Sequence, residues 1–153
     1  MTLVNQIKSD TTQAMKDGNK AKLSTLRLLV SELEKEKVSM KLADVNGLKD
    51  EQVQTVISRQ IKKLDKEIEA YQNVNRSTES QEAEKELLIS YLPKQATAKE
   101  IRELTYRAVN LARRREINNP MQYLSQRLKG KADMKLVSKV VKEVQRELDD
   151  DNA

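Results

Sequence analysis

Apolar residues recur every three or four positions through most of this 153-residue chain, with polar and charged residues between them. This period places the apolar side chains on one face of an α-helix. Short polar or glycine-containing breaks divide the pattern into seven segments. We therefore predict seven helices, which lie within residues 3–15, 22–38, 53–71, 78–92, 97–112, 120–128 and 133–148.

The second and third segments carry the most regular apolar faces. In the second, the predicted inward face consists of Leu23, Leu26, Leu29, Val30, Leu33 and Val38. In the third, a heptad-like stripe consists of Val53, Ile57, Ile61, Leu64, Ile68 and Tyr71. Such a stripe fits a helix inside an intramolecular bundle or a coiled-coil dimer. The bundle is favoured, because a sustained zipper needs roughly three or four clean heptads.

Capping residues mark several helix boundaries. The first helix, whose apolar set includes Met15, is followed by Gly18, which can adopt the left-handed conformation of a C-terminal cap. A Thr followed three residues later by Glu or Gln has the spacing of a capping box, and Asn before Pro is typical of a helix start. These start signals are Thr78 with Gln81, Thr97 with Glu100, and Asn119 with Pro120.

The composition favours an all-α fold. Three Gly and two Pro are too few for the many tight turns of a β-sandwich or barrel. Charged residues make up 35% of the chain, which suits helices with narrow apolar stripes and large solvated faces. A break at Pro93 separates the fourth helix from the fifth. We predict an N-terminal four-helix bundle-like domain, residues 1–93, then a small three-helix C-terminal domain, residues 97–150. We expect the acidic tail, residues 149–153, to be disordered.

The chain contains neither cysteine nor histidine. Disulfides and thiolate metal sites are therefore excluded, and so are the commonest general base and the commonest metal ligand. No apolar run approaches the roughly 18 residues that a membrane span needs, and the first ten residues are too polar for a signal peptide. We expect a cytoplasmic protein with no membrane partner.

Positive charge is concentrated in the C-terminal third. Residues 99–146 contain 13 Lys/Arg against 5 Asp/Glu, whereas residues 1–97 contain 16 against 15. A concentrated positive field attracts nucleic acid, an acidic membrane or an acidic protein surface.

Residues 127–136, RLKGKADMKL, place Gly130 between two lysines and ahead of a helix that opens at Asp133. A catalytic phosphate-binding loop needs several glycines, a preceding strand, and Ser or Thr after the lysine. None of these is present, so a catalytic role is excluded. A weaker anion site, with Lys129 and Lys131 flanking the turn, and a plain connection between two helices both remain possible.

A second basic cluster, Arg113, Arg114 and Arg115, lies at the end of the fifth predicted helix. Consecutive helical residues point about 100° apart, so the three side chains cannot all contact one flat surface. The cluster fits a solvated helix end or a phosphate contact.

Carboxylates are grouped in two places, at Glu82, Glu84 and Glu86 and at Asp65, Glu67 and Glu69. They alternate with lysines along exposed helix faces, so we interpret them as solvated surface and expect no metal site. No activating base lies near the Ser, Thr, Lys or Tyr residues, so no independent catalytic centre and no cofactor are expected.

Four stretches, taken in order, resemble the GatB/YqeY family: KLSTLRLLVSELEKEKV, SRQIKKLDKEIEAYQNVNR, YLPKQATAKEI and LKGKADMKLVSKVVKEV. This family comprises the tail domain of the B subunit of the glutamine-dependent aspartyl/glutamyl-tRNA amidotransferase and its free-standing relatives. The resemblance implies a helical bundle followed by a smaller three-helix domain. It also implies tRNA contact by a tail that does not itself carry out amide transfer.

On this resemblance, the turn from Lys129 to Asp133 is the best candidate for a feature that faces RNA. Our leading hypothesis is a non-catalytic protein that binds tRNA, or an aminoacyl-tRNA-processing enzyme, through its basic C-terminal domain. The alternatives are a protein-interaction adaptor and an accessory to the glutamine-dependent carbon-nitrogen ligase activity of tRNA amidotransferase. The predicted RNA-binding residues are Lys129, Gly130, Lys131, Lys135, Arg113, Arg114, Arg115 and Arg127.

Overall fold

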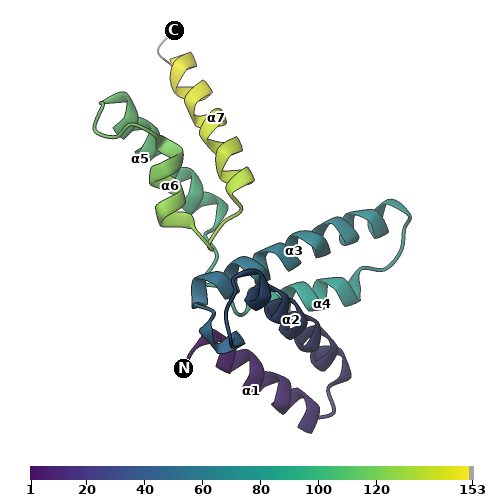
Figure 1. The fold of residues 1–153 in the computed structure, drawn as a ribbon. Helices are drawn as coiled ribbons and strands as arrows, with labels where there is room; N and C mark the ends of the chain where they lie inside the picture. The colour runs from purple at the N-terminus through teal and green to yellow at the C-terminus, as the bar shows by residue number, and fades with distance from the viewer. Residues whose placement is uncertain (152–153) are drawn as a thin grey trace. The chain divides into compact units, whose positions relative to one another are not determined.

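A computed structural model describes residues 1–151, and over that range the protein is all-α, as predicted (Figure 1). It contains seven α-helices, one short 3-10 helix and no strand within those residues. The helices are α1 (Leu3–Lys16), α2 (Lys20–Ser39), η1 (Val45–Gly47), α3 (Asp50–Asn73), α4 (Glu79–Ile89), α5 (Ala98–Arg113), α6 (Pro120–Leu128) and α7 (Met134–Asp151).

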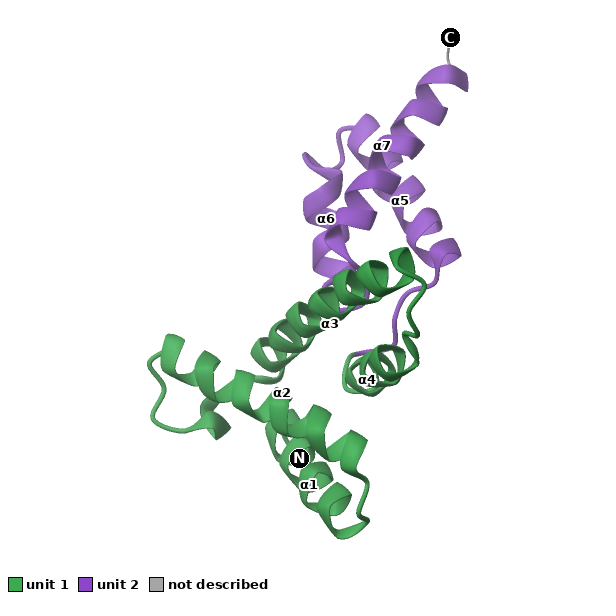
Figure 2. Ribbon diagram, turned by 90° about the vertical axis from the view of Figure 1, so that its right-hand side faces the viewer, with its two compact units in different colours: residues 1–92 green, residues 93–153 purple. Residues whose placement is uncertain are grey.

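The chain forms two compact units, Met1–Leu92 and Pro93–Ala153, which are coloured separately in Figure 2. We call them unit 1 and unit 2. Each unit has its own cluster of buried apolar side chains. The predicted RNA-binding residues all belong to unit 2.

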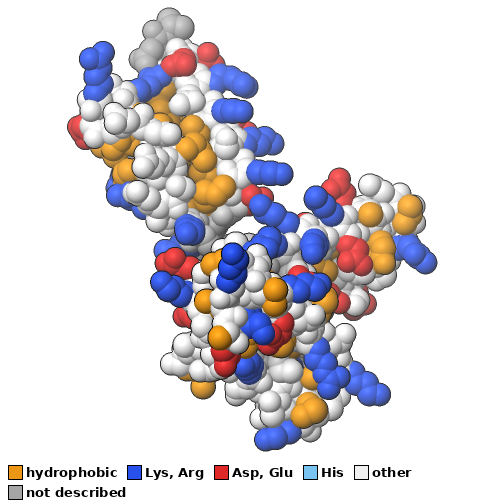
Figure 3. All heavy atoms as spheres, viewed as in Figure 1, with side chains coloured by type: hydrophobic (Ala, Val, Ile, Leu, Met, Phe, Trp, Pro, Cys, Tyr) orange, Lys and Arg blue, Asp and Glu red, His pale blue; other side chains and the backbone are white. Residues whose placement is uncertain are grey.

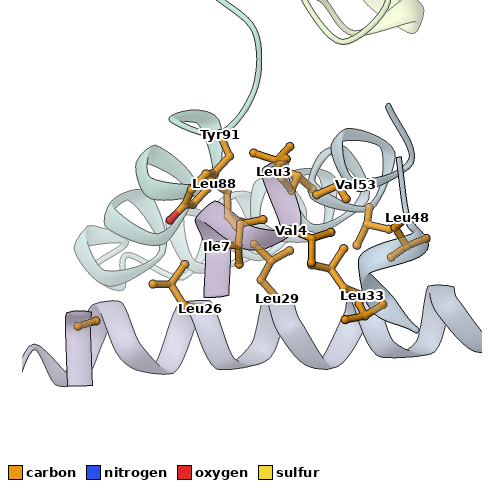
Figure 4. Packing of buried hydrophobic residues seen from close by; sticks show 14 of the residues in the cluster. Leu3, Val4, Ile7, Leu26, Leu29, Leu33, Leu48, Val53, Leu88 and Tyr91 are labelled. Carbon is orange, nitrogen blue, oxygen red and sulfur yellow. The ribbon is translucent and has the colours of Figure 1, made fainter. Parts of the chain in front are cut away.

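The core of unit 1 is built by α1, α2, α3, α4 and the loop that carries η1 (Figure 4). Its fully buried side chains include Ile7, Leu26, Leu29 and Ile57. The phenol of Tyr91 lies at the edge of this core and donates a hydrogen bond of 2.6 Å to Asp10 Oδ2. Burial and this hydrogen bond both raise the pKa of Tyr91, so the phenol stays protonated in the neutral pH range.

Two apolar residues that we predicted to face the core are exposed instead. Val38 is 70% exposed and Met15 is 56% exposed. Val38 lies five residues after the buried Leu33, which turns it about 140° away from that side chain. Met15 follows the buried Ala14 by one position and therefore points about 100° away from it.

The predicted capping signals differ in outcome. Gly18 adopts a φ of 68°, and its N–H donates to Met15 O, so it ends α1 as expected. Asn119 accepts a hydrogen bond of 2.9 Å from the Met121 N–H, with Pro120 as the first residue of α6. The capping box at Thr78 was wrong, because the Thr78 side chain makes no capping hydrogen bond and Gln81 donates to Glu67 instead.

In unit 2, α5, α6 and α7 pack around one small core. Its buried apolar side chains are Ile101, Ala108, Val109, Leu124, Leu128, Val137, Val141 and Val144. Thr105 is also fully buried, and its hydroxyl donates to Ile101 O at 2.6 Å, which satisfies the one polar group of that side chain.

The predicted disorder of the acidic tail was wrong for residues 149–151, which continue α7. Asp149 forms an ion pair with Arg113 of α5. Residues 152 and 153 lie outside the described residues.

Candidate nucleic-acid interface

The glycine turn connects α6 to α7. Gly130 has a φ of 74°, and the Leu128 carbonyl accepts hydrogen bonds from the N–H groups of Lys131 at 2.9 Å and Ala132 at 3.1 Å. Asp133 Oδ1 accepts the Lys135 N–H at 3.0 Å and opens α7. The turn is therefore a helix connection, and it leaves the side chains of Lys129 and Lys131 exposed.

The carbonyl groups of this turn are bound by the segment that precedes α5. The Ala96 N–H donates to Lys131 O at 2.9 Å, and Gln95 Nε2 donates to Gly130 O at 2.8 Å. Gln95 Nε2 also bonds Pro93 O at 2.9 Å. These contacts fix the turn beside the N-terminal end of α5.

The arginine cluster lies at the opposite end of unit 2. Arg113 is the last residue of α5 and forms an ion pair with Asp149 near the end of α7. Arg114 Nη1 lies 3.9 Å from Glu116 Oε1. Arg115 has a φ of 60° and terminates the helix as a glycine would. Since α5 is about 22 Å long, the predicted RNA-binding residues divide into two groups at its two ends.

A row of four cations, Lys135, Lys139, Lys142 and Arg146, runs along α7 between those ends; we call it the α7 row. The positions step by 4, 3 and 4, so the four side chains share one helix face about 16 Å long. This face is opposite the buried Val137, Val141 and Val144. Figure 3 shows Lys and Arg side chains following one another along the side where α7 lies in Figure 1.

All four side chains of the α7 row are exposed, and none forms an ion pair within residues 1–151. Of these four residues, only Lys135 was predicted from the sequence to bind RNA. The helical spacing of the other three was a signal that could have identified the whole row.

Two acidic residues of α7, Glu143 and Glu147, lie on another face, toward α5. Glu147 accepts hydrogen bonds from the Tyr106 hydroxyl and from Arg102, and Glu143 lies 4.0 Å from Arg102. The bonds from Tyr106 and Arg102 lower the pKa of Glu147. Because these carboxylates are occupied by α5, they do not neutralise the α7 row.

An open groove of about 480 Å³ lies in unit 2 between α5, α6 and the glycine turn. Four cations and two carboxylates line it, over an apolar floor. The cations are Lys94, Arg107, Arg127 and Lys131, the carboxylates are Glu100 and Glu103, and the floor consists of Ala96, Leu104 and Leu128. Two of the predicted RNA-binding residues, Arg127 and Lys131, therefore line the same groove. Lys94 and Arg107 line it as well, and neither was predicted from the sequence to bind RNA.

The described residues offer no other obvious chemical centre. Within residues 1–151, no group of three or more acidic side chains is arranged to hold a metal ion. In the same range, no helix combines the length and the apolar character that crossing a bilayer requires. Glu84 has a raised pKa, caused first by burial and then by the neighbouring Glu67, and it forms no ion pair within residues 1–151.

Comparison with known proteins agrees with the resemblance found in the sequence. Residues 4–145 match the family model described as Yqey-like protein. No curated protein matches the chain.

Proposed function

The chain belongs to the Yqey-like family, and from this premise we propose that it is a non-catalytic tRNA-binding protein whose contacts are made by unit 2. The proposal also rests on the excess of positive charge in residues 99–146. Its proposed assembly partner is an enzyme that processes aminoacyl-tRNA, as the resemblance to the amidotransferase tail implies.

The observation that carries the proposal is the α7 row. Exposed cations that no carboxylate neutralises attract a polyanion more strongly than paired ones, because binding does not first break an internal ion pair. A straight row about 16 Å long also suits a sugar-phosphate backbone better than a single small anion.

Recognition of the backbone is favoured over recognition of splayed bases. The chain has no Trp or Phe, and its four tyrosines offer little stacking surface. Tyr91 is buried, the Tyr106 hydroxyl donates a hydrogen bond to Glu147, and the ring of Tyr123 is covered by Arg127. Tyr71 belongs to unit 1, where the Arg76 guanidinium carbon lies 5.8 Å from the centre of its ring. RNA binding without free aromatic rings depends on phosphate and shape contacts.

A salt titration tests the proposal. We expect the variant Lys135→Gln, Lys139→Gln, Lys142→Gln and Arg146→Gln to bind deacylated tRNA far more weakly. The slope of log K against log salt is negative, and each lost phosphate contact makes it less steep by about 0.7–0.9, so four lost contacts should make it less steep by about three. Fluorescence titration at four or more salt concentrations measures both quantities.

The matched control is Lys16→Gln, Lys20→Gln, Arg27→Gln and Lys66→Gln in unit 1, which removes the same charge from exposed helix faces. This control should keep the wild-type slope. Equal losses in both variants would show that only net charge matters, and an unchanged affinity in the α7 variant would refute the proposal. Capture of an acidic protein after nuclease treatment, without RNA binding, would favour the adaptor instead.

A further inference from the structure

We propose that the groove between α5, α6 and the glycine turn binds one ribonucleotide unit. Its cations hold the phosphate, and its carboxylates accept hydrogen bonds from the sugar hydroxyls. This inference deepens the proposed function and rests on it for the source of the nucleotide, which is a residue of an RNA strand. The same chemistry would also take a free nucleoside monophosphate.

The cations of the groove come from separate segments that the fold holds together. Lys94 belongs to the segment before α5, and Lys131 belongs to the glycine turn. The hydrogen bonds from Ala96 N–H to Lys131 O and from Gln95 Nε2 to Gly130 O tie these two segments to each other. The two backbone segments that carry these lysines are therefore held together before any ligand arrives, which lowers the entropic cost of binding.

Arg127 is the most strongly oriented of the four cations. Its guanidinium carbon lies 3.6 Å from the centre of the Tyr123 ring, and Nη1 donates to Tyr123 O at 3.3 Å. Stacking on the ring fixes the plane of the guanidinium, and no carboxylate within residues 1–151 pairs with it. A guanidinium held flat presents its remaining N–H groups to two oxygens of one phosphate.

The acidic side chains make the groove more selective than a simple phosphate site. Glu100 and Glu103 are exposed on α5 and offer only acceptors, so they repel a bare phosphate but accept hydrogen bonds from hydroxyl groups. The apolar floor suits the face of a sugar or base, and about 480 Å³ falls within the usual size of a ligand pocket. A ribose differs from a deoxyribose by the 2′-hydroxyl, so this acceptor pair favours RNA.

The groove and the α7 row lie on different sides of unit 2. The α5 residues that line the groove, such as Leu104, are two positions from Arg102 and Tyr106, which contact α7. Two positions correspond to about 200° around a helix. The two surfaces can therefore be altered independently, and a failure of one proposal can be distinguished from a failure of the other.

The test is a titration of the full chain, followed by amide NMR, with three probes: adenosine 5′-monophosphate, its 2′-deoxy analogue and inorganic phosphate. We expect adenosine monophosphate to shift the amides of residues 94–107 and 127–131. It should bind about fivefold more tightly than the deoxy analogue, the effect of one hydrogen bond. Arg127→Gln should lower the affinity for both nucleotides at least about tenfold, because a charge-assisted hydrogen bond to the phosphate is lost.

The double variant Glu100→Ala and Glu103→Ala gives the sharpest result. It should bind inorganic phosphate more tightly, because two negative charges are removed, and should no longer distinguish the ribose from the deoxyribose. The α7 row variant should bind adenosine monophosphate as the wild type does. Equal affinities for the two nucleotides in the wild-type protein, or shifts confined to α7, would overturn the inference.

Competition identifies the source of the nucleotide. A single-stranded RNA of ten residues should displace adenosine monophosphate from the groove, whereas a DNA strand of the same sequence should do so less well. Displacement by RNA supports a strand as the ligand. If neither strand displaces the mononucleotide, the ligand is a free nucleotide and the link to RNA is wrong.

Discussion

Gly130 is the residue on which the α6–α7 turn depends. Its φ of 74° lies in the left-handed region, where a Cβ atom is strained. The same conformation brings Lys131 O and Gly130 O against the segment before α5, so one glycine supports both the helix connection and one wall of the groove.

We expect Gly130→Ala to lower the free energy of unfolding by about 1–2 kcal/mol, the cost of placing a side chain at this φ. Denaturant unfolding followed by circular dichroism measures the change. The control is Gly47→Ala, because a Cβ atom there would meet Leu42 only at ordinary contact distances of 3.6 Å or more. That control should change stability by less than about 0.5 kcal/mol. Equal effects at the two positions would contradict this account of the turn.

At the scale of the element, α7 has three distinct faces. One face packs into the core, one carries the α7 row, and one directs Glu143 and Glu147 toward Arg102 of α5. Because Glu143 and Glu147 face α5, they do not pair with the cations of the α7 row. Those cations are spaced by three or four residues, so they repel one another along the helix. The hydrogen bonds from Tyr106 and Arg102 to Glu147 help to hold the helix in place despite that repulsion.

The network around Glu147 predicts a pH dependence of stability. The folded pKa of Glu147 is lowered, so its contribution is fully present above the unfolded pKa of about 4.5 and is lost as pH falls through the folded value. Thermal unfolding between pH 2.5 and pH 7 should show a smaller acid-dependent loss for Glu147→Gln than for the wild type.

Glu116→Gln is the control for this experiment. Glu116 is an exposed residue 3.9 Å from Arg114, and surface pairs of this kind contribute little. Its unfolding temperature should follow the wild-type pH profile. A Glu147→Gln profile that overlays the wild type would show that the bonds from Tyr106 and Arg102 do not stabilise the folded state.

At the scale of the whole molecule, each unit has its own apolar core. Leu124 is fully buried in unit 2, and Leu29 is buried in unit 1. Within 151 described residues, stability is therefore built from two small clusters rather than one large core. Small cores are sensitive to the loss of a single side chain.

We expect Leu124→Ala to destabilise unit 2 by about 2–5 kcal/mol, through lost burial and the cavity it leaves. Hydrogen exchange should show faster exchange in α5, α6 and α7. Leu29→Ala should instead accelerate exchange in α1, α2 and α3. A uniform acceleration across both units in either variant would contradict the view that each core stabilises its own unit.

The sequence alone determined the helices and most of their ends. The apolar period of three to four residues, the Asn119–Pro120 start and the Gly18 stop all act within a few residues, so local interactions decide them. The concentration of positive charge in the C-terminal third was likewise visible from composition. The prediction that Val38 faces the core was wrong. A spacing of five residues from Leu33 is close to the helical period of three to four, but it turns the side chain about 140° away from the buried face.

Only the tertiary structure decided which charges meet. In the folded unit 2, Arg113 lies at the opposite end from the glycine turn and pairs with Asp149, and Glu147 pairs with Arg102 of α5. The cations of the α7 row are exposed and form no ion pair within residues 1–151. Lys94 and Lys131 are far apart in the sequence but line the same groove. Their segments are held together by the hydrogen bond from the Ala96 N–H to Lys131 O. Helix periodicity fixes the direction of a side chain relative to its own axis, whereas its neighbours depend on how separate helices pack.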